Sequence, residues 1–155
     1  MKHFNDLIAE CLTEVDELFP WDLEERLSLD NAPFLLDVRE PEEYRQLHIP
    51  GSINAPRGIL ETCCEWDYEE TIPELVEARD REVVVICRSG NRSVLAAHTL
   101  QRMGYKKVIS LKTGIRGWND YEQPLVDQTE QPVAIEQADE ILRSRIRPEQ
   151  RRPPL

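Results

Sequence analysis

Cys87 stands at the head of a short polar and basic segment, Cys87-Arg88-Ser89-Gly90-Asn91-Arg92-Ser93. Residues 83–86 before it are apolar and β-branched, which is typical of a strand buried on both faces. Residues 94–103 after it are rich in helix formers, and Gly104 is suited to end that helix. The sequence therefore predicts a cysteine in the loop between a buried strand and a helix N-terminus, where open α/β sheets bind ligands.

The composition of this loop favours a nucleophilic cysteine. The positive end of the helix dipole, together with Arg88 and Arg92, would stabilise a thiolate over a thiol. Gly90 would let backbone N–H groups point inward and form a nest for an anion. The remaining positions carry short polar side chains that can cap the helix or hold the loop: Ser89, Asn91 and Ser93. The alternative is an inert cysteine that serves only for packing. The two arginines and the glycine favour a reactive cysteine.

Three segments of the chain resemble the signatures of rhodanese-like sulfurtransferases. The loop follows the pattern Cys87-x-x-Gly90-x-Arg92-Ser93, residues 35–56 resemble the upstream signature of that family, and residues 111–118 resemble its closing segment. The resemblance covers about Val15 to Pro124. It implies a rhodanese-like open parallel sheet with helices on both faces, to which this chain adds N- and C-terminal helices.

The same resemblance implies a sulfurtransferase. Cys87 would take a sulfane sulfur from thiosulfate or a persulfide, carry it as a persulfide, and pass it to a thiophilic acceptor such as a thiol, cyanide or a sulfur-carrier protein. A preformed thiolate needs no further residue as a base for this chemistry. A non-catalytic binding module, or a redox sensor with a reversibly oxidised Cys87, is the alternative.

The length of the loop separates sulfur transfer from phosphate chemistry. Related cell-cycle and protein tyrosine phosphatases have five residues between cysteine and arginine, with a histidine before the cysteine. Here four residues separate Cys87 from Arg92, and Ile86 precedes the cysteine. A tighter loop suits a single sulfur atom, so a phosphatase or an enzyme like arsenate reductase is the less favoured activity.

Other polar residues and cysteines accompany the motif. We expect Asp37, Arg39 and His48 to orient the active loop and brace the edge of the sheet rather than react. Cys63 and Cys64 lie in a stretch, residues 57–80, that could wall the pocket. They would either relay sulfur from Cys87, or resolve it as a disulfide, or simply pack under a short helix with Trp66.

Strand-like and helical segments alternate along the chain, which predicts a parallel sheet joined by right-handed crossovers. Residues 1–14 form a helical extension, which we expect to cover the domain rather than to dock a partner. Residues 15–124 form the rhodanese-like domain. Residues 125–155 form a second extension, with a helix and a disordered, basic, proline-rich tail.

Composition limits the remaining functions. The 155 residues include 19 Lys and Arg against 30 Asp and Glu, a net charge of −11 that argues against nucleic-acid binding. No apolar run is long enough for a membrane span, and no secretory signal is evident, so we expect a cytoplasmic protein with free thiols. Two adjacent cysteines lack zinc-site spacing, so we expect no metal and no cofactor. The expected partners are a small anionic sulfur donor and a thiol or carrier-protein acceptor, and the oligomeric state stays open.

Overall fold

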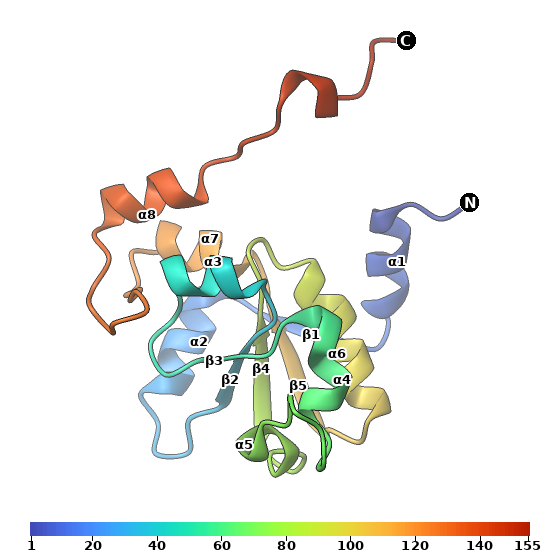
Figure 1. The fold of residues 1–155 in the computed structure, drawn as a ribbon, viewed down its shortest axis with the longest axis vertical. Coiled ribbons are helices and arrows are strands. Elements are labelled where there is room, and N and C mark those ends of the chain that lie inside the picture. Colours follow the sequence, from blue (N-terminus) through green and yellow to red (C-terminus); the bar gives the residue numbers. More distant parts are fainter.

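A five-stranded parallel sheet, with strand order β1-β5-β4-β2-β3, forms the centre of the molecule (Figure 1). The computed structural model describes all residues from 1 to 155. The strands are β1 (Asp16–Leu18), β2 (Phe34–Asp37), β3 (Ile53–Asn54), β4 (Glu82–Ile86) and β5 (Lys107–Leu111). The open parallel sheet predicted from the sequence is confirmed, and strand β4, which precedes Cys87, lies at its middle.

Helices cover both faces of this sheet. They are α1 (Phe4–Cys11), α2 (Pro20–Leu27), α3 (Pro41–Gln46), α4 (Leu60–Cys63), α5 (Pro73–Val76), α6 (Arg92–Arg102), α7 (Gly114–Asp120) and α8 (Ile135–Leu142), with 3-10 turns η1 (Arg57–Ile59) and η2 (Pro148–Gln150). None of them is long and apolar enough to cross a membrane.

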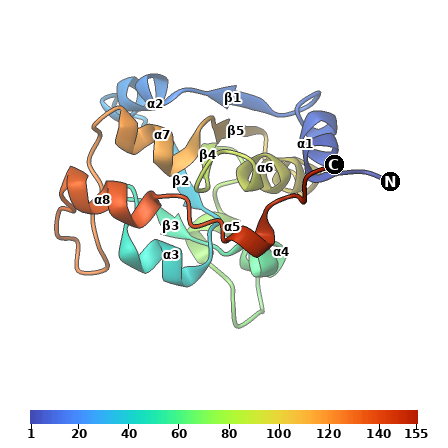
Figure 2. The same cartoon turned by 90° about the horizontal axis from the view of Figure 1, so that it is seen from above.

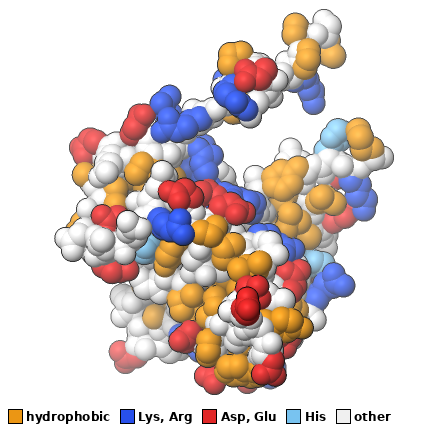
Figure 3. Space-filling model, in the orientation of Figure 1, with side chains coloured by type: hydrophobic (Ala, Val, Ile, Leu, Met, Phe, Trp, Pro, Cys, Tyr) orange, Lys and Arg blue, Asp and Glu red, His pale blue; other side chains and the backbone are white.

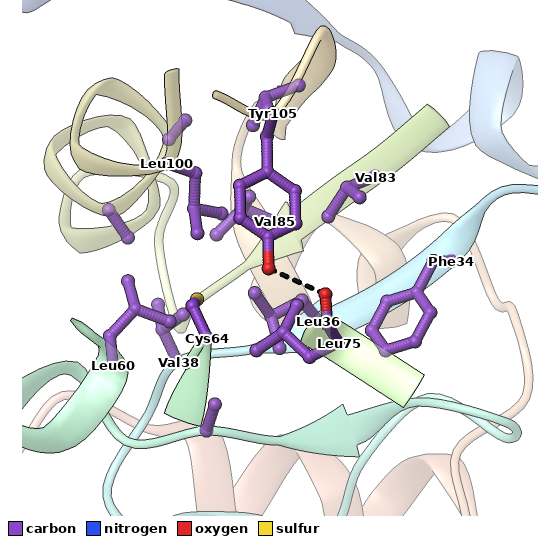
Figure 4. Close-up of a cluster of buried hydrophobic side chains, with 14 of the residues drawn as sticks. Phe34, Leu36, Val38, Leu60, Cys64, Leu75, Val83, Val85, Leu100 and Tyr105 are labelled. Atoms are coloured by element: carbon purple, nitrogen blue, oxygen red, sulfur yellow. Dashed lines mark hydrogen bonds between the residues drawn. The ribbon is translucent and has the colours of Figure 1, made fainter. Parts of the chain in front are cut away.

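The apolar run of β4 divides its side chains between two cores. Val83 and Val85 pack with residues of α1, α4, α5 and α6, whereas Val84 and Ile86 pack with residues of α2, α7 and α8. Figure 4 shows the first of these cores, with Val83 and Val85 facing Leu100 and Tyr105. Because successive side chains of a strand point to opposite faces, a strand covered on both sides must be apolar throughout.

Both terminal extensions contribute to these cores. Ile8 of α1 is buried against α6, and the carboxylate of Glu14 lies 2.7 Å from Nε2 of His98 on that helix. Ala138 and Leu142 of α8 are buried against α7. The two helices are therefore parts of the packed domain.

The C-terminal arm, residues 143–155, leaves the packed domain after α8. It rises beyond the carboxyl ends of the strands in Figure 1, and Figure 2 shows it crossing from α8 toward α1. Within residues 147–155, which the sequence predicts to be disordered, one short 3-10 turn, η2, starts at Pro148. A proline suits this position because its fixed φ is already helical and its missing N–H would have no helical partner.

A buried ion pair closes the carboxyl end of β2. Nη2 of Arg39 donates to Oδ2 of Asp37 at 2.8 Å and to the carbonyl of Leu47 at 2.7 Å, and the two charged side chains are 2% and 0% exposed. His48 stacks on the ring of Tyr44. None of the hydrogen bonds made by Asp37, Arg39 or His48 reaches Cys87. Their contacts hold the segment between α3 and β3 against the sheet.

Replacing Arg39 by Met should destabilise the fold strongly. The Asp37 carboxylate would remain buried without its cation, which typically lowers the free energy of unfolding by about 3–5 kcal/mol. Urea denaturation measures the loss. Arg45→Met is the control, since its exposed pair with Glu42 should change stability by less than about 1 kcal/mol. Equal losses in the two variants would contradict this role for the buried pair.

Candidate active site

The loop that starts at Cys87 rests on the N-terminus of α7. The N–H of Ile115 donates to the carbonyl of Cys87 at 2.9 Å, and the N–H of Arg116 donates to the carbonyl of Arg88 at 3.0 Å. These N–H groups lie in the first turn of α7, where no intrahelical carbonyl is available to them. Helix α7 therefore fixes the start of the loop through its backbone.

Two glycines allow the loop and α7 to approach each other. Gly90 has φ +91°, and a Cβ there would lie 2.8 Å from the backbone nitrogen of Thr113. Gly114 has φ +61°, and a Cβ there would lie 2.5 Å from the carbonyl oxygen of Cys87. Both conformations and both distances exclude an ordinary side chain.

The sulfur of Cys87 has two polar neighbours. The N–H of Gly90 donates to Sγ at 3.1 Å, and Oγ of Ser93 lies 3.3 Å from Sγ. Oγ of Ser93 in turn shares a hydrogen bond of 2.7 Å with Oγ of Ser110 on β5. When Cys87 is a thiolate, the Ser93 hydroxyl can donate to it while accepting from Ser110. Ser110 was not among the predicted site residues, and its only signal in the sequence is a hydroxyl between the apolar residues Ile109 and Leu111.

The guanidinium of Arg92 is held at the side of the loop by α3. It donates to both carboxylate oxygens of Glu43, at 2.8 and 2.9 Å. Burial alone raises the pKa of Glu43, but the hydrogen bonds and charge of Arg92 outweigh it and hold that pKa below its usual value. The pairing raises the pKa of Arg92 in return, chiefly through the hydrogen bonds to Glu43.

The guanidinium of Arg88 turns toward the end of α8. Its Nη2 donates to the carbonyl of Leu142 at 2.6 Å, a carbonyl at the helix C-terminus that lacks a helical partner. Burial, followed by the positive charge of Arg116, lowers the pKa of Arg88. We expected both arginines of the loop to surround the sulfur. Both line the cavity at Cys87, and their guanidinium groups hydrogen-bond to α8 and α3 rather than to Sγ.

A cavity of about 190 Å³ opens beside Cys87. Its lining combines the loop with the N-terminal extension: Phe4, Cys87, Arg88, Ser89, Asn91 and Arg92. We expected residues 57–80 to form a wall of the pocket, but none of them lines this cavity. Phe4 of α1 contributes to the lining instead. Asn91 occupies the N-cap position of α6, but no side chain caps that helix, so the expected capping is not found.

Cys63 and Cys64 lie in the core at α4. Both are buried, and burial raises the pKa of Cys63 to about 11 and that of Cys64 in the same direction. Figure 4 shows Cys64 near Leu60 and Val38. Trp66, expected to pack with the cysteines, is instead 50% exposed. A buried thiol with a raised pKa forms little thiolate at neutral pH, so these features favour a packing role.

Comparison with known proteins gives the same picture of the domain. The family model of the rhodanese-like domain matches residues 20–121, from α2 to the end of α7. The chain is 33% identical over 112 residues to a sulfurtransferase of Allochromatium vinosum, covering 72% of this chain and 95% of the relative. It is 36% identical over 122 residues, 76% of this chain, to Bacillus subtilis YrkF, provisionally named a sulfur carrier protein, but spans only 60% of that protein.

One solved structure is similar over most of its length. It is a Rhodopseudomonas palustris protein of unknown function, described as a possible tyrosine phosphatase. The TM-score is 0.71 at 30% identity, and the match covers 80% of this chain and 94% of that one. Helix α1, helix α8 and the C-terminal arm lie outside the range matched by the family model.

Replacing Ser110 by Ala should slow alkylation of Cys87 by iodoacetamide. Ser93 would lose the hydrogen-bond partner that orients its hydroxyl, and a neutral hydrogen bond contributes about 0.5–1.5 kcal/mol, which corresponds to roughly two- to tenfold in rate. Mass mapping of the modified peptide gives the rate at Cys87. Ser89→Ala is the control, because Ser89 is exposed and makes no hydrogen bond to the sulfur. Equal rates in both variants would contradict the role of Ser110.

Proposed function

The chain belongs to the rhodanese-like domain family, and from that premise we propose that it moves a sulfane sulfur from thiosulfate or a persulfide, through a persulfide on Cys87, to a thiophilic acceptor. Relatives named as sulfurtransferases support sulfur transfer in general. The observation that carries the finer proposal is the position of Cys87, whose sulfur accepts from the N–H of Gly90, lies 3.3 Å from the hydroxyl oxygen of Ser93 and borders an open cavity.

The first half-reaction loads Cys87. The thiolate attacks the sulfane sulfur of thiosulfate, a new S–S bond forms, and the S–S bond of thiosulfate breaks. Sulfite leaves with the electron pair, so the step needs no external oxidant or reductant. Arg88 and Arg92 at the cavity attract the anionic donor, while the acidic protein as a whole repels it.

The loop then stabilises the charge on the loaded sulfur. The N–H of Gly90 is a fixed donor to Sγ, the hydroxyl of Ser93 can donate once the sulfur is charged, and the first turn of α6 adds the positive end of its dipole. Fixed donors of this kind need no reorganisation when negative charge develops beside them. An acceptor thiolate finally attacks the outer sulfur, and the electron pair of the broken S–S bond returns to Cys87.

The spacing of the loop separates this proposal from phosphate-ester hydrolysis. Four residues lie between Cys87 and Arg92. The Arg92 guanidinium donates a hydrogen bond to each oxygen of the Glu43 carboxylate. A phosphate ester would have to compete with that carboxylate for the same donors. The four cysteines are free, which suits a reducing compartment, and we propose the cytoplasm.

Incubation with thiosulfate should add one sulfur atom to the wild-type protein. Intact-mass spectrometry detects the added mass, which dithiothreitol should remove, and Cys87→Ser should not acquire it. Glutathione persulfide serves as the second donor. If neither donor loads Cys87 while the protein hydrolyses p-nitrophenyl phosphate, the proposal is wrong and a phosphatase replaces it. If the protein shows neither sulfur loading nor phosphate hydrolysis, the proposal is also wrong and the remaining function is a binding or sensing module.

The double variant Cys63→Ala/Cys64→Ala tests the relay hypothesis. Since both thiols are buried with raised pKa values, we expect it to discharge sulfur from Cys87 at the wild-type rate. It should also lose about 1–3 kcal/mol of stability, because two buried sulfur atoms leave a gap in the core. Slower discharge with normal loading would instead establish a relay.

A further inference from the structure

A second cavity, of about 520 Å³, adjoins the cavity at Cys87 and is lined by four arginines. We call it the arginine groove, after Arg88, Arg116, Arg143 and Arg145. Arg88 lines both cavities, so the groove and the cavity at the reactive sulfur are neighbours. Figure 3 shows Lys and Arg side chains gathered beneath the C-terminal arm, beside the hollow that separates the arm from α1.

The positive charge of the groove is only partly compensated. Glu43, the acidic residue of its lining, already binds Arg92. The carboxylate of Glu140 forms salt bridges with both Arg143, at 3.0 Å, and Arg145, at 3.6 Å. Arg116 has no ion-pair partner within 4.0 Å, and its charge adds to burial, the larger cause, in lowering the pKa of Arg88. An acidic protein that gathers arginines in one groove beside its reactive loop has a surface complementary to anions.

The shape and chemistry of the groove select among anions. Planar guanidinium groups bind carboxylates through two parallel hydrogen bonds, so several of them together suit a ligand with more than one carboxylate. The volume lies in the range of small-molecule sites.

We propose that the arginine groove binds the carboxylates of a small anionic thiol, which thereby places its sulfur at Cys87 and accepts the transferred sulfur. This inference rests on the function proposed above and adds the class of acceptor. The thiolate attacks the outer sulfur of the Cys87 persulfide, the S–S bond to Cys87 breaks with its electron pair on Cys87, and the acceptor leaves as a persulfide. The carboxylates only hold the acceptor.

The C-terminal extension is what completes this site. Arg143 and Arg145 lie beyond residue 121, where the match to the family model ends. They are positioned because Leu142 is buried in the core and its carbonyl accepts from Arg88. Acceptor selection is then a property added to the domain by its own extension.

Discharge kinetics test the proposal with a matched pair of acceptors. Wild-type protein loaded with thiosulfate is mixed with mercaptosuccinate, a dicarboxylate thiol, or with thioglycerol, which is neutral, at equal thiolate concentrations. The ratio of the two second-order rate constants should favour mercaptosuccinate. It should fall about tenfold in Arg143→Gln/Arg145→Gln, as expected for the loss of charge-assisted hydrogen bonds. Added salt should reduce the wild-type ratio.

The matched control is Arg147→Gln/Arg151→Gln, which removes the same charge from the same arm at exposed residues outside the groove. It should retain the wild-type ratio. The proposal is overturned if Arg143→Gln/Arg145→Gln keeps the ratio, or if the control lowers it equally, since charge on the arm rather than the groove would then explain the preference.

A binding measurement separates this inference from the proposed function. If Cys87 takes up no sulfur, the proposed function fails, and calorimetric titration of the unloaded protein with succinate still tests the groove. Weaker succinate binding to Arg143→Gln/Arg145→Gln than to the control supports the groove as a carboxylate site. Equal binding to the two variants, or no binding to the wild type, overturns it.

Discussion

The close backbone contact between the Cys87 loop and the start of α7 is the constraint on which the site depends. Gly90 and Gly114 both adopt positive φ, and a side chain on either would collide with the backbone opposite. The contact allows the free N–H groups of α7 to hold the carbonyls of Cys87 and Arg88. With those carbonyls satisfied from one side, the loop can curl so that the N–H of Gly90 points at the sulfur.

Neutral and charged polar groups occupy different parts of the site: the neutral groups lie at the sulfur, and the charged groups form the rim around it. Neutral donors from Gly90 and Ser93 contact the sulfur, while the charged groups of Arg88 and Arg92 bind acceptors on α8 and α3. Short neutral donors suit a single sulfur atom that gains and loses negative charge, because they are fixed before the charge develops. Charges at the rim act at longer range, where they attract anionic reactants and distinguish one from another.

The sheet and its two cores give this local geometry its rigidity. Strand β4 is buried on both faces, and its neighbour β5 supplies Ser110 to the chain of hydroxyls that ends at Cys87. The Asp37–Arg39 pair closes the end of β2 on the other side of β4. Buried polar groups of this kind are costly unless every donor and acceptor is matched, and no buried side-chain polar atom in the structure lacks a partner.

Local patterns in the sequence predict the alternation of strands and helices and identify the reactive loop. Periods of two and of 3.6 residues are local properties, so β4 and α6 were predicted to within a few residues from their own segments. The partners of the loop were decided only by the tertiary structure. Arg92 meets Glu43 across 49 residues and Arg88 meets Leu142 across 54, and the arginine groove needs an arm that no local pattern connects to Cys87. Such contacts depend on how crossovers and terminal helices pack, and packing is a property of the whole chain rather than of any one segment.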